Sequence, residues 1–148
     1  MARLAPALVA RPDVALPEAA AAGVGGPWRP TLLYLFQSAD CARHAALQRR
    51  WAGLGRDGLA SVVGVRLDPL EPARADGAPS PGPGFPLRQD LRAGAARLMK
   101  RLGYRTTPVT VVLDPRGRPR LVLPPPVDEQ SAEAGALAVR AVLAGMGR

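Results

Sequence analysis

The residues best suited to chemistry are the single cysteine, Cys41, and the single histidine, His44. Cys41 follows an apolar run and begins an expected helix, where unpaired backbone N–H groups and the helix dipole favour a thiolate and lower its pKa. His44 comes one turn later, near enough to share that face and to assist the thiolate when protonated. Arg43 adds a nearby cation, whereas the carboxylate of Asp40 raises the pKa of a neighbouring thiol. The pattern predicts a reactive thiol at Cys41, modulated by Asp40 and Arg43.

Both residues also have plainer interpretations. Cys41 is equally consistent with an unreactive remnant, and His44 with an acid/base partner, a thiolate stabiliser or a packed core residue. A metal bound to this pair would need at least two further donors, from carboxylates or a second subunit, so we expect no metal and no cofactor. One cysteine also excludes an internal disulfide, a CxxC redox pair and a cysteine-rich zinc site.

The elements that must position Cys41 follow from apolar patterning. A continuous apolar run predicts a buried strand over Thr31–Phe36, and the spacing of Leu47 and Trp51 predicts a helix over Cys41–Trp51, with Gln48 among its polar covering residues. The other expected elements are an edge strand over Val14–Leu16, a helix end at Gly53 and Gly55, a strand over Ala60–Leu67, a helix over Leu87–Leu102 capped by Gly103, a strand over Val109–Leu113, a tight turn over Asp114–Gly117, a strand over Arg120–Leu123 and a helix over Ser131–Met146. This order predicts an α/β fold with a central mixed sheet and helices on both faces.

The chain of 148 residues has the length of one domain. We expect a flexible arm over residues 1–10 and a single domain over residues 11–148, with a Pro/Gly-rich insertion over residues 68–86. No apolar run is long enough to span a membrane. The first residues make no convincing signal peptide, because Pro6 interrupts a short apolar stretch and charged residues soon end it. The expected location is therefore the cytoplasm, with an extracytoplasmic location as the alternative if a signal segment is missing from the start.

The net charge of +8 suggests an anionic partner, but its distribution argues against nucleic acid. The basic residues are almost all Arg and are spread along the chain, and aromatic residues make up only 4%, too few for a base-stacking surface. Four basic residues do gather on one helix face and the loop after it, namely Arg97, Lys100, Arg101 and Arg105. This stripe is either an ordinary solvated face or a surface that steers an acidic partner.

Two segments carry a family resemblance. The segment Phe36–His44 resembles the active-site segment of thioredoxin-like proteins, and Thr106–Gly117, a Thr-Pro followed by a strand and a turn, is similar to the second hallmark of that superfamily. Within it, Pro12–Pro17, Val63–Val65 and Phe85–Asp90 are similar to connecting segments of the TlpA/redoxin branch. The resemblance implies a thioredoxin-like fold with Cys41 at the start of the first long helix. It also implies a cis-proline, Pro108, facing Cys41, and a Thr107 backbone that pairs with an extended substrate.

The departures from the family pattern define the functional hypotheses. His44 replaces the second cysteine and Asp40 replaces the tryptophan before the first, giving a degenerate CxxH motif. The leading hypothesis is monothiol thiol–disulfide or peroxide chemistry at Cys41, with an external thiol as resolving partner. The alternative is a redox-inactive thioredoxin-like module that binds a protein. The expected partner is a protein or a small-molecule thiol or disulfide; whether the chain is an enzyme and its oligomeric state stay open.

Overall fold

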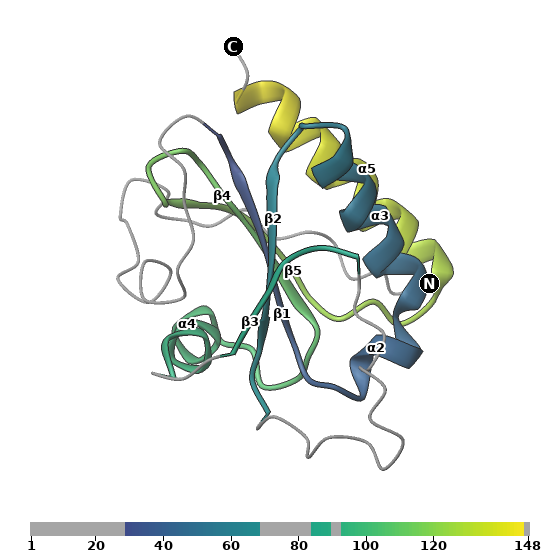
Figure 1. The fold of residues 1–148 in the computed structure, drawn as a ribbon, viewed down its shortest axis with the longest axis vertical. Coiled ribbons are helices and arrows are strands. Elements are labelled where there is room, and N and C mark those ends of the chain that lie inside the picture. Colours follow the sequence, from purple (N-terminus) through teal and green to yellow (C-terminus); the bar gives the residue numbers. More distant parts are fainter. Residues whose placement is uncertain (1–28, 69–83, 90–92, 147–148) are drawn as a thin grey trace.

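The computed structural model describes residues 29–68, 84–89 and 93–146 (Figure 1). The elements in chain order are β1 (Thr31–Phe36), α2 (Asp40–Arg43), α3 (Ala45–Arg56), β2 (Ser61–Arg66), β3 (Leu87–Gln89), α4 (Gly94–Leu102), β4 (Val109–Leu113), β5 (Pro119–Leu123) and α5 (Glu129–Met146). The expected arm over residues 1–10, the expected strand over Val14–Leu16 and the middle of the expected insertion lie outside the described residues.

The strands form one sheet in the order β3-β2-β1-β4-β5. Strand β1 pairs in parallel with β2 and antiparallel with β4, while β2 pairs in parallel with β3 and β4 antiparallel with β5. All six residues of β1 are buried, as expected for a central strand that is covered on both faces. The predicted mixed sheet is confirmed, and the β1 and β4 boundaries are the predicted ones.

Helices cover both faces of the sheet, as predicted. Helices α3 and α5 lie side by side on one face, and α4 lies on the other (Figure 1). On the first face Trp51 and Leu54 of α3 and Val139 of α5 pack against β1 residues such as Tyr34. On the second face Leu98 of α4 is fully buried against the opposite side of the central strands. Within the described residues, no helix is long and apolar enough to cross a membrane.

The first predicted helix, over Cys41–Trp51, differs from the structure in its interior and at its C-terminal end. It breaks at His44, whose φ of −123° and ψ of 32° separate α2 from α3. The helix also continues through Gly53 and Gly55 to Arg56, so the predicted end is wrong. Burial of the apolar side chains on its inner face outweighs the helix propensity lost at two glycines. The chain reverses instead at Gly58, which has a left-handed φ of 72°.

The second predicted helix is wrong over its first turn, because Leu87–Gln89 form the edge strand β3. The tertiary cause lies in Gly64 of β2, which pairs with Leu87 and donates its backbone N–H to the Pro86 carbonyl at 2.9 Å. A Cβ on Gly64 would come within 2.7 Å of Leu87 and 2.9 Å of Phe85. The missing side chain therefore makes room for the strand, and α4 begins only at Gly94. The predicted cap at Gly103, with φ 85°, is confirmed.

Candidate functional site

Cys41 lies just beyond the carboxyl end of the central strand β1. The turn from Gln37 to Asp40 carries the chain from the strand into α2. It closes through the Asp40 N–H donating to the Gln37 carbonyl at 2.9 Å and the Gln37 N–H donating to Asp40 Oδ2 at 2.8 Å. Asp40 is thereby buried, with 6% of its surface exposed, and Cys41 is half-buried against the core under α3 and α5. The central strand and this turn fix the position of the thiol.

A second carboxylate, that of Asp68, holds the same turn from the end of β2. The Ser38 N–H donates to Asp68 Oδ1 at 3.0 Å, and Arg66 Nε donates to the same oxygen at 3.2 Å. Burial raises the pKa of Asp68, but the hydrogen bonds from Ser38 and the charge of Arg66 outweigh it, and the pKa is lowered overall. Asp68 therefore stays ionised beside the turn that carries Cys41.

Gln48 is a site residue, contrary to its predicted place on the solvent-exposed face of the helix. It was predicted to be a polar covering residue, yet only 3% of its surface is exposed. Its Nε2 donates to the Tyr34 hydroxyl at 3.1 Å and approaches the Asp40 carbonyl at 3.4 Å. Gln48 thus links α3, β1 and the turn before Cys41. The available signal was its spacing: Cys41 and Gln48 are seven residues apart, which places both on one side of a helical segment.

The pKa of Cys41 is raised above its ordinary value, contrary to the expected fall. Burial is the largest cause, and the charges of Asp40 and Asp68 add to it, while the hydrogen bond with Gln48 and the charge of Arg66 act in the opposite direction. The helix behind Cys41 offers little compensation, because α2 has only four residues before the break. The thiol form of Cys41 is therefore favoured at neutral pH.

The structure does not bring His44 and Cys41 together as an interacting pair. In the described part of the chain, no hydrogen bond links them, and His44 does not contribute to the pKa shift of Cys41. Half-buried at the helix break, His44 lines an open groove with Arg43 and the start of α5, at Asp128 and Glu129. The expected assistance from His44 and Arg43 is thus not seen in the geometry.

Thr107 and Pro108 lie at the same end of the sheet as the Cys41 turn. The Thr107–Pro108 peptide bond is cis. Strand β4 starts immediately after it, with Val109 opposite Leu35 of β1, so Pro108 is level with the end of β1. Thr107 lines a groove together with Gln37, which belongs to the Cys41 turn. Within the described ranges, the backbone N–H and C=O of Thr107 have no hydrogen-bond partner.

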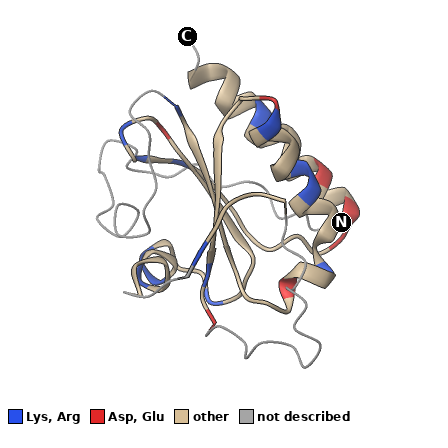
Figure 2. Cartoon of the chain, viewed as in Figure 1, with Lys and Arg blue, Asp and Glu red and all other residues tan. Residues whose placement is uncertain are grey.

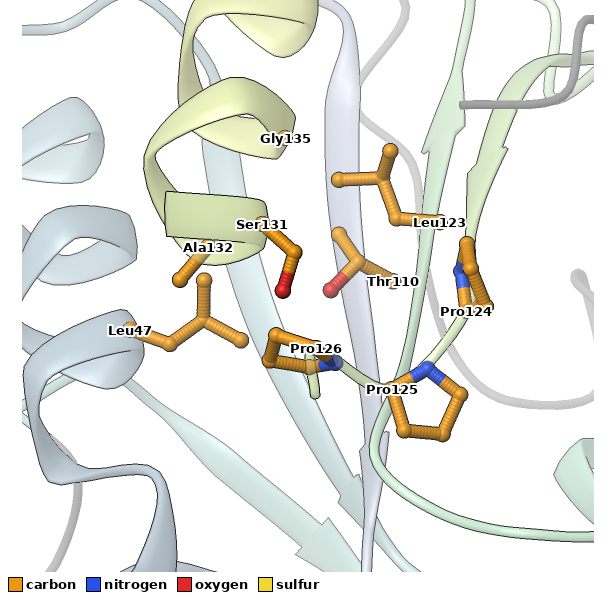
Figure 3. A pocket seen from close by; sticks show the side chains of 9 residues that line it. All are labelled: Leu47, Thr110, Leu123, Pro124, Pro125, Pro126, Ser131, Ala132 and Gly135. Carbon is orange, nitrogen blue, oxygen red and sulfur yellow. The ribbon is translucent and has the colours of Figure 1, made fainter. Parts of the chain in front are cut away.

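A separate small pocket lies between α3, α5 and the end of β5 (Figure 3). The hydroxyl oxygens of Thr110 and Ser131 point into it, and its other walls are apolar. Its volume is about 20 Å³, enough for one or two water molecules and too small for an organic substrate. Across residues 29–68, 84–89 and 93–146, no group of three His, Cys, Asp or Glu side chains is arranged to hold a metal ion.

Comparison with known proteins gives structural likenesses only. No protein-family model matches the chain, and no curated protein matches it in sequence. Among solved structures it is similar to peroxiredoxin Q of Xanthomonas campestris, with a TM-score of 0.56, 17% identity and coverage of 81% of each chain. It is also similar to StoA from Bacillus subtilis, with a TM-score of 0.44, 19% identity and coverage of 72% of this chain and 82% of that one. The likeness to peroxiredoxin Q confirms the fold that the sequence resemblance implied.

Proposed function

We propose that this chain, which has the thioredoxin-like fold, is a monothiol protein that forms a mixed disulfide through Cys41 and depends on an external thiol to resolve it. The observation that carries the proposal is the placement of Cys41: the one thiol of the chain is half-exposed at the carboxyl end of β1. The backbone of Thr107, which has no hydrogen-bond partner in the part of the chain that the structure describes, lies at the same end of the sheet and suits strand addition by an extended partner.

The proposed exchange requires only one thiol from this chain, because an external thiol completes it. The Cys41 thiolate attacks one sulfur of a partner disulfide, a new S–S bond forms, and the other partner sulfur leaves as a thiolate that takes up a proton. A second thiol, such as glutathione, then attacks the mixed disulfide and returns Cys41 to its reduced form. With a peroxide in place of a disulfide, Cys41 is oxidised to a sulfenic acid, the peroxide is reduced to water or an alcohol, and two external thiols restore Cys41.

The raised pKa of Cys41 sets the pH dependence of this chemistry. Because burial favours the protonated thiol, the attacking thiolate is a small fraction at neutral pH and grows as the pH rises. We therefore expect the exchange to be slow at neutral pH and its rate to keep rising beyond pH ~8.5, the ordinary pKa of a cysteine.

The test measures Cys41 reactivity directly. The folded protein is mixed with a neutral aromatic disulfide over a range of pH, and the released aromatic thiol is followed by its absorbance. Cys41→Ser is the control for background release. We expect release of one aromatic thiol per chain, a rate that rises through alkaline pH, and recovery of free Cys41 on adding glutathione. No reaction of the folded protein even at a pH where the thiolate is abundant would refute the proposal.

A second candidate, a binding module without redox chemistry, is favoured by the raised pKa of Cys41 and by the lack, among the described residues, of a hydrogen bond between His44 and Cys41. In that case the surface around Thr107 binds a protein partner, and the sulfur has no role. Cells that carry Cys41→Ser in place of the natural chain distinguish the two: an unchanged phenotype supports the binding module, and the phenotype of a gene deletion supports the monothiol protein.

A further inference from the structure

The groove that contains Thr107 has a distinctive composition. It runs between the Cys41 turn, the end of β2 and the carboxyl end of α4, and its volume is about 600 Å³. That volume lies in the ~300–1,000 Å³ range of pockets that bind organic ligands, so the groove has room for several side chains. The residues that line it are Gln37, Leu67, Ala96, Met99, Lys100, Gly103, Tyr104, Arg105 and Thr107.

Apolar side chains contribute a large part of the groove wall. Met99 is almost fully buried, and Leu67 and Tyr104 are half-buried beside it, packed against the α4 side of the core. Backbone hydrogen bonds hold these residues in place: the Tyr104 N–H donates to the Met99 carbonyl at 3.0 Å, and the Leu67 N–H donates to the Phe36 carbonyl at 2.9 Å. The groove therefore offers a preformed apolar wall.

Among the described residues that line the groove, the charged ones are all cationic. Lys100 and Arg105 are exposed, and neither has an ion-pair partner among the described residues. Within residues 29–68, 84–89 and 93–146, no carboxylate lines the groove. The nearest acidic residue along the chain, Asp68, is already bound to Arg66 and to the Ser38 N–H. In Figure 2 the ribbon of α4, the helix that forms this side of the groove, carries blue Lys and Arg positions. The surface beside Thr107 therefore complements a negative charge.

We propose that this groove selects extended polypeptide segments that carry an acidic side chain next to an apolar one. The inference rests on the proposed function, since it names the class of partner that pairs with Thr107. Successive side chains of an extended segment point to opposite sides. A partner that pairs with the Thr107 backbone can thus direct an apolar residue to the wall at Met99 and Tyr104, while a neighbouring carboxylate lies near Lys100 or Arg105.

Two short cysteine-free peptides test the selectivity. One alternates valine and glutamate and the other valine and lysine, and fluorescence anisotropy measures their binding to the full chain. We expect tighter binding of the glutamate peptide, weakened by added salt. The double variant Lys100→Glu/Arg105→Glu should reduce its affinity about tenfold or more. Arg49→Glu/Arg116→Glu is the matched control, because it makes the same change in net charge at two exposed residues outside the groove.

Three outcomes overturn the inference: equal binding of the two peptides, binding of neither, or an equal loss of affinity in Arg49→Glu/Arg116→Glu, which would indicate a general effect of net charge. The neutral aromatic disulfide separates this failure from that of the proposed function, because its reaction with Cys41 requires no charged groove. If the aromatic thiol is released normally but neither peptide is preferred, the groove selectivity is refuted and the proposed redox function stands. If the glutamate peptide is preferred but no aromatic thiol is released, the proposed redox function is refuted and the groove selectivity stands.

Discussion

Replacing Gln48 by methionine is the sharpest test of how the Cys41 environment is built. Methionine keeps the length and the helix propensity of glutamine but has no N–H donor. Gln48 donates to the Tyr34 hydroxyl at 3.1 Å and approaches the Asp40 carbonyl at 3.4 Å, and its hydrogen bond with Cys41 lowers the pKa of that thiol. One substitution therefore perturbs both stability and thiol reactivity.

The magnitude depends on which partners stay satisfied. The Asp40 carbonyl keeps a hydrogen bond from the His44 N–H at 2.9 Å, so its loss is partial. The Tyr34 hydroxyl is fully buried and, within the described residues, has Gln48 as its only hydrogen-bond partner. An unsatisfied buried hydroxyl costs about 1–3 kcal/mol, so we expect Gln48→Met to lower the free energy of unfolding by about 2 kcal/mol. The pKa of Cys41 should rise further.

A double-mutant cycle checks this account. Adding Tyr34→Phe removes the orphaned hydroxyl, so Tyr34→Phe/Gln48→Met should recover most of the stability lost in Gln48→Met. Urea unfolding gives the free energies, and the iodoacetamide alkylation rate against pH gives the pKa of Cys41. Arg49→Met is the control, because Arg49 is an exposed neighbour on the same helix. If Gln48→Met matches Arg49→Met in both measurements, or if the double variant loses the sum of the two single losses, the reasoning is refuted.

Three further predictions concern stability, each measured by urea unfolding. Gly64→Ala should lower the free energy of unfolding by about 1–3 kcal/mol, because its Cβ would lie 2.7 Å from Leu87. Gly53→Ala, whose Cβ would meet nothing nearer than 3.7 Å, should raise the free energy of unfolding by about 0.5–1 kcal/mol. Equal effects of the two substitutions would contradict the packing argument. Because the pKa of Cys41 is raised in the folded state, Cys41 contributes stability that is fully present below pH ~8.5 and is lost as the pH rises through the folded pKa. The free energy of unfolding should therefore fall above pH ~8.5 more steeply than it does in Cys41→Ser. Parallel pH profiles of the two proteins would exclude this linkage. Asp128→Ala should cost about 1 kcal/mol, because its carboxylate accepts a 2.7 Å hydrogen bond from a first-turn N–H of α5, and unchanged stability would rule out this cap.

The parts of the fold that the sequence predicted are those with a strong local pattern. The apolar run of β1 and the turn over Asp114–Gly117 need no distant partner to be recognised. The short strand β3 escaped prediction because it depends on Gly64, more than twenty residues earlier in the chain. The helix break at His44 also escaped prediction, since no proline or glycine marks it.

In the candidate site too, the features that depend on a local segment were predicted and those that depend on distant residues were not. The position of Cys41 followed from one local segment, and the structure agrees. Its protonation does not follow from sequence neighbours alone, because the environment also includes Gln48 from α3 and Asp68 from the end of β2, which only folding brings to the turn. A local helix-dipole argument therefore gave the wrong sign of the pKa shift, since burial and acidic neighbours outweighed it.

The way both described ends of the 68–86 segment attach to the core has an evolutionary and engineering consequence. At one end Asp68 binds the Ser38 N–H, and at the other Phe85 packs edge-on against Tyr34 with ring centroids 5.8 Å apart. Since these contacts are independent of the number of residues between them, and loop-closure entropy changes slowly with length, this is a permissive place for insertions and deletions. We expect homologues to vary in length here, and a tag or a foreign sequence grafted between the two anchors to leave the register of the sheet unchanged.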